Sequence, residues 1–225
     1  MSAFSKAVAL IVGGDKSLWF VINTSLRFSF WSTIFSVLPG LPLAFMLFLM
    51  KGRLRNILAA IVNAIMALPT VVIGLFVYSA ISNRGPLGSL KLLFAPGGVI
   101  IGQSLLALPL VIAMTYTGFQ KLDPRYHETL TTLGAGLFSK MATIMREGRY
   151  VILQAALSAF GRVTGEVGVS MMLGGNIKGY TRTMTTSVAL EISKGEFEYA
   201  LALGLILLIV ALLINVLSHL GIRND

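Results

Sequence analysis

One basic and one acidic residue lie four positions apart inside an otherwise apolar stretch. Arg162 and Glu166 occur in FGRVTGEVG, and this spacing places both side chains on one helix face. At the centre of a bilayer a charge costs about 2.5–3.5 kcal/mol, so in a membrane segment both must face protein or water. Two interpretations stay open. In the first, the two charges pair with each other or with another helix and fix the packing. In the second, Arg162 lines a path for an anion, and Glu166 neutralises Arg162 when the path is empty.

Neighbouring glycines bear on that choice. Gly161 and Gly165 form a GxxxG pattern, which allows close helix approach and indicates a packed interface. Packing and path lining are compatible if this interface is the path. Gln103, in another apolar segment, marks a pore or gate position or is a satisfied amide, and the second reading is the commoner one in membrane helices.

A second polar group follows in the loop GGNIKGYTRT. Asn176, Lys178 and Arg182 lie there among glycines and hydroxyl side chains. Backbone donors and cations together suit an anion or an acidic docking partner, although a solvated loop has the same composition. His127 and His219 lie far apart without ligand-like neighbours, so the sequence predicts no metal site. It has no GxxxxGK[ST] pattern and no hydrolase motif, so we expect no catalytic residues and no cofactor bound by this chain.

The composition places these residues in a membrane protein. Of the 225 residues, 56% are hydrophobic and 12% are charged, whereas soluble domains carry about 25% charged residues. The net charge of +9 comes from 18 Lys and Arg that are scattered between apolar blocks. This pattern favours anionic lipid headgroups or an anionic solute over nucleic acid. The absence of cysteine excludes disulfides and thiolate metal sites.

The apolar blocks predict an all-α integral membrane protein with about five transmembrane helices. A span needs roughly 20 residues. Because the charged Arg27 lies in the first third of the apolar stretch 18–50, we expect the first span after it and an interfacial lead-in at 18–27. Residues 1–17 form an interfacial segment and 221–225 a tail. The expected spans cover residues 28–50, 56–81, 98–119, 150–173 and 197–217.

The long polar loop 121–149 is amphipathic. Asp123-Pro124 is typical of a helix start, and Gly134 and Gly136 predict a turn between two short helices. Apolar residues recur there at spacings of three and four, at Leu130, Leu133, Leu137, Met141 and Ile144. Such a helix at a membrane surface offers a face to a partner. Lys and Arg lie closer together on the side that carries this loop and the C-terminus, which favours a cytoplasmic location for both.

At these residues the chain resembles a family. Glu128, Gly134 and Ile144 are similar to the EAA loop of the membrane subunits of ABC importers, with Thr129 and Leu130 in place of two alanines and Arg146-Glu147 in place of Leu-Pro. Further segments resemble the tungstate/molybdate branch, and the MREGR form is closer to the tungstate permeases. They are LPTVVIGL at 68–75, RGPLG at 84–88, DPRYHETLTTLGA at 123–135, FGRVTGEVGVSMMLGGNI at 160–177 and SKGEFEYALALG at 193–204.

The resemblance implies a type I ABC importer permease fold over residues 18–220. It implies a homodimer that moves an oxyanion such as tungstate between two copies of the chain. The loop 121–149 would then be the coupling segment that docks on a separate, ATP-binding ATPase subunit. Its contact residues would be Glu128, Thr129, Leu130, Leu133, Gly134, Ala135 and Leu137. The outer loop with Asn176, Lys178 and Arg182 would receive an extracytoplasmic oxyanion-binding protein, and Arg162, Glu166 and Gln103 would lie on the path or gate.

Other readings compete with this one. A molybdate or sulfate ABC permease would share the architecture and differ in the ion. A self-sufficient secondary anion transporter would work from an ion gradient alone, but the sequence shows no inverted repeat. A membrane scaffold or an intramembrane enzyme would transport nothing. Dependence on an added ATPase and an added binding protein separates these classes.

Overall fold

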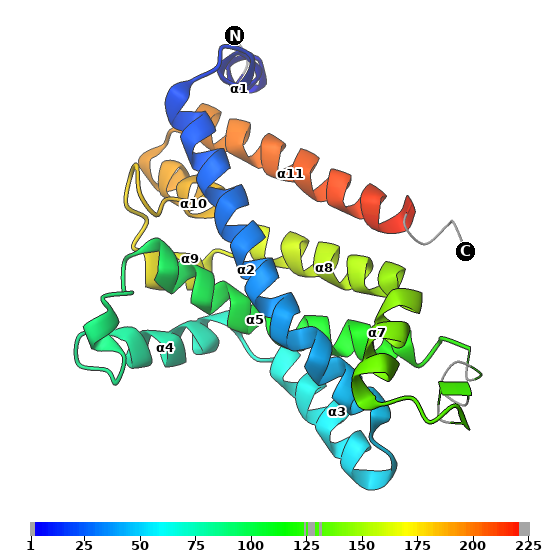
Figure 1. The fold of residues 1–225 in the computed structure, drawn as a ribbon. Helices are drawn as coiled ribbons and strands as arrows, with labels where there is room; N and C mark the ends of the chain where they lie inside the picture. The colour runs from blue at the N-terminus through cyan, green and yellow to red at the C-terminus, as the bar shows by residue number, and fades with distance from the viewer. Residues whose placement is uncertain (1–2, 124, 126–128, 131, 221–225) are drawn as a thin grey trace.

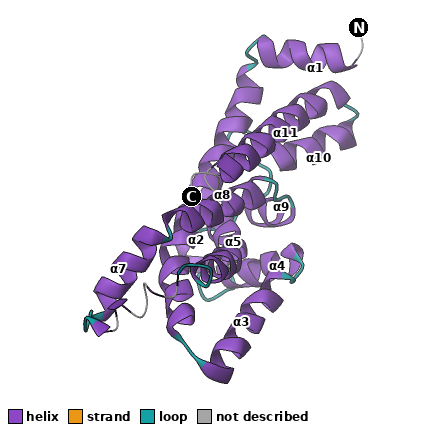
Figure 2. Ribbon diagram, turned by 90° about the vertical axis from the view of Figure 1, so that its right-hand side faces the viewer, coloured by secondary structure: helices purple, strands orange, loops and turns teal. Residues whose placement is uncertain are grey.

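The computed structural model describes residues 3–123, 125, 129–130 and 132–220, and this part of the chain folds into helices joined by short loops (Figures 1 and 2). A short 3-10 turn, η1, covers Gly88–Leu90. The α-helices are α1 Ala3–Val12, α2 Lys16–Leu49, α3 Gly52–Met66, α4 Thr70–Ile81, α5 Pro96–Phe119, α7 Leu137–Glu147, α8 Arg149–Thr164, α9 Gly168–Gly174, α10 Met184–Lys194 and α11 Phe197–Leu220.

Helix α2 runs the length of the molecule and organises the bundle around it (Figure 1). It packs along α5, and α5 packs in turn on α8 and α9. The contact face of α2 carries small hydroxyl side chains at Ser25, Ser29, Ser32 and Ser36, all buried. Small residues let membrane helices approach closely, because lipid offers no hydrophobic drive for their association.

Three helices are long and apolar enough to cross a membrane: α2, α5 and α11. Helices α3 and α4 meet that test only as a pair, and they are bent by 92°. The span expected over 56–81 is therefore not one straight helix but two helices that meet at a sharp bend. Pro69 is the N-cap of α4, and a proline disfavours helical geometry in the residue before it. The preceding turn tightens, since Ala67 and Leu68 donate to carbonyls three residues back.

Two further boundaries differ from expectation. The helix expected over 150–173 breaks after Thr164, where Gly165 ends α8, and α9 starts at Gly168. The expected lead-in 18–27 is no separate element, because α2 is continuous from Lys16. Asp15 fixes that start, since its carboxylate accepts from the Leu18 N–H at 2.8 Å.

The N-terminal helix lies across one end of the molecule (Figure 2). Its Ala7 is fully buried against α2 and α11, and Lys6 pairs with Glu198 of α11 at 3.1 Å. Phe4, Val8 and Val12, spaced four apart, stay exposed along another stripe of the helix. An interfacial position for residues 1–17 therefore remains our prediction, now with a defined apolar face.

Candidate functional site

The loop 121–149, which we call the coupling segment after its expected role, contains the glycine turn that its sequence predicts. Gly134 has φ +65, and the Ala135 N–H donates to the Leu130 carbonyl at 3.0 Å. This is the Schellman pattern that ends helices at a left-handed glycine. Thr129 and Leu130 are helical on one side, and α7 follows on the other. Glu128 lies outside the described residues.

The apolar stripe of this segment divides between two directions. Ile144 is 2% exposed and packs with Phe45 of α2 and Phe119 of α5. Leu130 and Met141 border the same cluster. The remaining apolar side chains point outward, with Leu133 76%, Leu137 62% and Phe138 82% exposed. One set thus fixes α7 to the bundle, and the other (Leu133, Leu137 and Phe138) forms an exposed surface, which we call the apolar knob.

Arg162 and Glu166 do not form the ion pair that one reading expected. Glu166 is 9% exposed, and its carboxylate accepts from the Val169 N–H at 3.1 Å, at the start of α9. Its carbonyl oxygen accepts from the Thr185 hydroxyl at 2.9 Å. The helix breaks at Gly165 between them, so that Arg162 is exposed in the last turn of α8 and Glu166 is buried before α9. Within the described part of the chain, Arg162 has no hydrogen-bond or ion-pair partner.

Gln103 is a fully engaged amide in the core. It is 2% exposed, and both of its N–H donors are used, toward the Val163 carbonyl at 3.3 Å and the Ser170 hydroxyl at 3.0 Å. Its oxygen accepts from Ser32 at 2.9 Å. The amide therefore ties α2, α5, α8 and α9 together at the α8–α9 break. This geometry favours a packing role over the path role expected for it.

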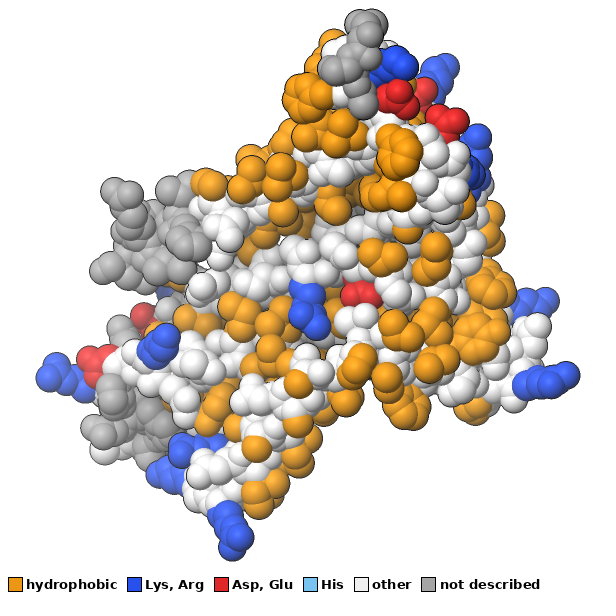
Figure 3. Space-filling view, turned by 180° about the vertical axis from the view of Figure 1, so that it is seen from behind, with side chains coloured by type: hydrophobic (Ala, Val, Ile, Leu, Met, Phe, Trp, Pro, Cys, Tyr) orange, Lys and Arg blue, Asp and Glu red, His pale blue; other side chains and the backbone are white. Residues whose placement is uncertain are grey.

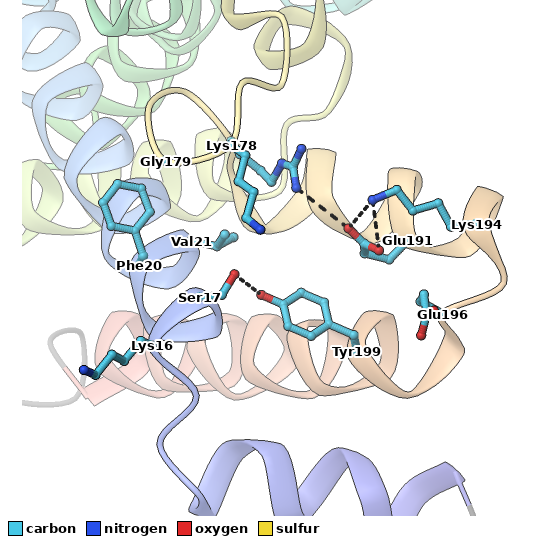
Figure 4. A pocket seen from close by; sticks show the side chains of 11 residues that line it. Lys16, Ser17, Phe20, Val21, Lys178, Gly179, Glu191, Lys194, Glu196 and Tyr199 are labelled. Atoms are coloured by element: carbon cyan, nitrogen blue, oxygen red, sulfur yellow. Dashed lines mark hydrogen bonds and ion pairs between the residues drawn. The ribbon is translucent and has the colours of Figure 1, made fainter.

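The loop after α9 folds back on itself. Asn176 adopts a left-handed conformation with φ +51, and its carbonyl accepts from the Arg182 guanidinium at 3.3 and 3.4 Å. Arg182 also lies 3.8 Å from the Glu191 carboxylate, which bonds to Lys194 at 3.2 Å (Figure 4). Lys178 remains exposed. Of the three predicted residues, two thus hold the loop together and one is presented outward.

This loop borders a cavity of about 720 Å³, which we call the charged cavity. Helices α2, α10 and α11 supply its other walls, and the Tyr199 hydroxyl bonds to Ser17 across it (Figure 4). Four basic and two acidic side chains line it: Lys16, Lys178, Arg182, Lys194, Glu191 and Glu196. An excess of cations in a concave site attracts anionic groups.

The charged cavity and the apolar knob lie at opposite ends of the bundle. Lys16, at the start of α2, borders the cavity, and Phe45, near the end of α2, lies under α7. A helix of 34 residues is about 50 Å long. Figure 3 shows Lys and Arg side chains mostly near the ends, with a largely apolar surface between them.

Two polar residues of α8 were not among the candidate site residues expected from the sequence. Gln154 and Ser158 precede Arg162 at intervals of four and are partly exposed along the same helix. Neutral polar residues in a membrane segment carry little signal one by one. Their common spacing with Arg162 was the signal that would have found them.

The chain matches a family model over residues 36–223, that of the binding-protein-dependent transport system inner membrane component. It therefore belongs to the multi-pass permease subunits of binding-protein-dependent ABC importers, which lie in the inner membrane.

Particular relatives are tungstate permeases. The chain is 37% identical to the tungstate uptake system permease protein TupB of Campylobacter jejuni, over 96% of this chain and 90% of that protein. It is 35% identical to TupB of Peptoclostridium acidaminophilum, over 96% and 95%. Similarity to the molybdenum permease ModB of Azotobacter vinelandii is lower, at 28% over 83% and 87%.

Solved ABC importers share the fold. A bacterial ABC transporter that imports alginate matches with a TM-score of 0.74 at 18% identity, over 99% of this chain and 84% of that one. The methionine transporter MetNI in inward-facing conformations matches with a TM-score of 0.66 at 17% identity, over 93% and 96%. The type I permease fold expected from the sequence is confirmed.

Proposed function

We propose that this chain is the membrane permease of a tungstate importer, powered by a separate ATPase subunit. The observation that carries the proposal is the similarity to two TupB proteins over 96% of the chain, against lower identity to ModB over a shorter part. Tungstate is a tetrahedral dianion, and the cation-rich outer cavity suits a system that handles anions. Molybdate or sulfate is the alternative cargo.

The coupling segment and the C-terminus both lie on the cytoplasmic side of the membrane. Its apolar knob docks in a groove of the ATPase, which binds the ATP. Ile144 and Phe119 connect that contact to α5 and α2, since their side chains share one cluster. Closure of the ATPase pair therefore tilts whole helices, so that the path opens in turn to the inside and to the outside.

The charged cavity is the extracytoplasmic docking site of an oxyanion-binding protein. Lys178 is exposed at its rim and is available to carboxylates of the partner, whereas Lys194 already pairs with Glu191. Selectivity for the ion rests mostly on that binding protein, because a path must hold its passenger weakly to release it.

Uptake into proteoliposomes tests the proposal. The permease, its ATPase and its binding protein are reconstituted with ATP on the ATPase side. Labelled tungstate accumulates only when all three proteins and ATP are present, and unlabelled tungstate competes better than molybdate or sulfate. Uptake by the permease alone on an ion gradient establishes a secondary transporter instead. Preferential competition by molybdate or sulfate reassigns the cargo.

A further inference from the structure

One face of α8 is polar through most of its length. Gln154, Ser158 and Arg162 repeat at intervals of four and therefore share a face. Each of them is partly or largely exposed. Within the described part of the chain none of the three has a hydrogen-bond or ion-pair partner. We call this row the polar face of α8.

Other faces of the same helix are apolar. Ala155, Ala159 and Val163 are buried in the bundle. Leu157 and Phe160 border a groove of about 380 Å³ against α2, in which the exposed lining is entirely apolar. Lipid or packed protein suits these two faces. The polar face has a different neighbour.

The depth of Arg162 in the membrane requires a polar neighbour for this face of α8. Arg162 follows Arg149, the first residue of α8, by thirteen residues, or about 20 Å along the helix. The hydrocarbon layer is about 30 Å thick, so Arg162 reaches its interior if α8 begins at the interface. A lipid-exposed charge there is expensive. The polar face therefore borders water or a second copy of the chain.

A cavity of about 600 Å³ opens at the coupling end of the same face. Thr117 of α5, Lys121 in the turn after α5, and Tyr150 and Gln154 of α8 give it polar walls. Among the described residues that line it, none is acidic. Lys121 thus stands at one end of a polar track and Arg162 at the other, with an amide and hydroxyls between them.

The size and chemistry of this cavity fit an anion in passage. Water occupies about 30 Å³ per molecule, so the space holds a small oxyanion together with much of its hydration shell. One ammonium group with neutral donors attracts a dianion without enclosing it. Weak binding of this kind allows release, which a conducting path requires.

We propose that the polar face of α8 and the cavity beside Lys121 form the coupling-side vestibule of the oxyanion path, with the opposite wall supplied by the second copy of the chain. This inference rests on the proposed transport function. It adds Lys121, Gln154 and Ser158 to Arg162 as lining residues and leaves Gln103 out.

Single-cysteine labelling tests it, because the chain contains no cysteine of its own. Ser158→Cys and Gln154→Cys are compared with their sequence neighbours Leu157→Cys and Leu153→Cys, which lie on the apolar side. Each variant is assembled with the ATPase in nanodiscs, where both sides are open to water. The probes are sulfonatoethyl methanethiosulfonate, an anion, and the trimethylammonium analogue, a cation.

We expect Ser158→Cys and Gln154→Cys to react at least tenfold faster than the neighbouring variants, with a preference for the anionic probe relative to a free thiol. Equal rates within each neighbouring pair, or a preference for the cationic probe, overturn the proposal. Uptake by the unlabelled variants separates the two failures. ATP-driven tungstate uptake with unreactive cysteines leaves the transport function standing and moves the path elsewhere. Absence of ATP-driven uptake in the parent complex removes the transport function, and the anion vestibule with it.

Discussion

The two ends of the molecule present opposite kinds of surface. At the coupling end, the apolar knob of Leu133, Leu137 and Phe138 is exposed on α7 and on the turn before it, and α7 is fixed to the bundle. At the other end, the charged cavity is concave and rich in Lys and Arg. Apolar contacts suit lasting complexes, whereas charged contacts speed encounter and weaken with salt. On the proposed function, this chain therefore keeps one partner at its apolar surface and exchanges another at its charged one.

The largest effect is expected at the apolar knob. Phe138→Asp places a charge where docking would bury it, so retention of the ATPase falls by tenfold or more. The folded permease tolerates the change because Phe138 is 82% exposed. Ser139→Asp, one residue along and also exposed, is the matched control. Co-purification in detergent measures the effect, and equal retention in both variants contradicts the assignment of this surface.

A smaller effect follows from the turn beneath the knob. Gly134→Val forces a branched side chain into a left-handed backbone at a cost of roughly 1–2 kcal/mol. A Cβ there meets open space, so the strain is conformational and not steric. We expect ATP hydrolysis to continue while uptake falls several-fold. Gly136→Ala has negative φ and equal space, and it leaves uptake unchanged. Normal uptake by Gly134→Val argues against a coupling role.

At the charged cavity the expected change is kinetic. Lys178→Glu reverses an exposed rim charge, so association with the binding protein slows about tenfold at low salt. The difference shrinks as added salt screens the charges. Arg84→Glu, in an exposed loop that does not line this cavity, serves as the control. Surface plasmon resonance at several salt concentrations measures both, and a salt-independent defect contradicts an electrostatic docking role.

The smallest effect separates the core from the path. Gln103→Leu removes one hydrogen bond each from Ser32, Ser170 and the Val163 carbonyl, so the free energy of unfolding falls by about 1–3 kcal/mol. Gln154→Leu removes an amide that has no partner within the described chain, and it leaves thermal stability in detergent unchanged. A loss of stability in Gln154→Leu, with none in Gln103→Leu, reverses the roles assigned to the two amides.

The sequence predicted the local features that follow from one residue type. Gly134 predicted its turn, because glycine alone adopts that backbone without strain. The apolar spacing predicted α7 and its amphipathic character. The resemblance predicted the family, which the comparison with known permeases confirms.

Features that depend on tertiary contacts were beyond the sequence. Spacing placed Arg162 and Glu166 on one helix face, but α8 ends at Thr164, and the Glu166 carboxylate accepts from the Val169 N–H of α9 instead. A glutamine in an apolar segment looks the same in the sequence whether it lines a pore or lies in a packed core. Only the three hydrogen-bond partners of Gln103 in the structure favour the core. The apolar stripe of the coupling segment gave no indication that three of its five residues pack against the bundle and two are exposed, since all five are apolar.

Sidedness tests the central claim most directly, that the two ends act on opposite sides of the membrane with the coupling segment inside. Phe138→Cys and Lys178→Cys are labelled in sealed right-side-out vesicles with an impermeant maleimide. If the coupling segment faces the inside, Lys178→Cys reacts at once and Phe138→Cys reacts only after the vesicles are opened. Immediate labelling at 138 in sealed vesicles contradicts it.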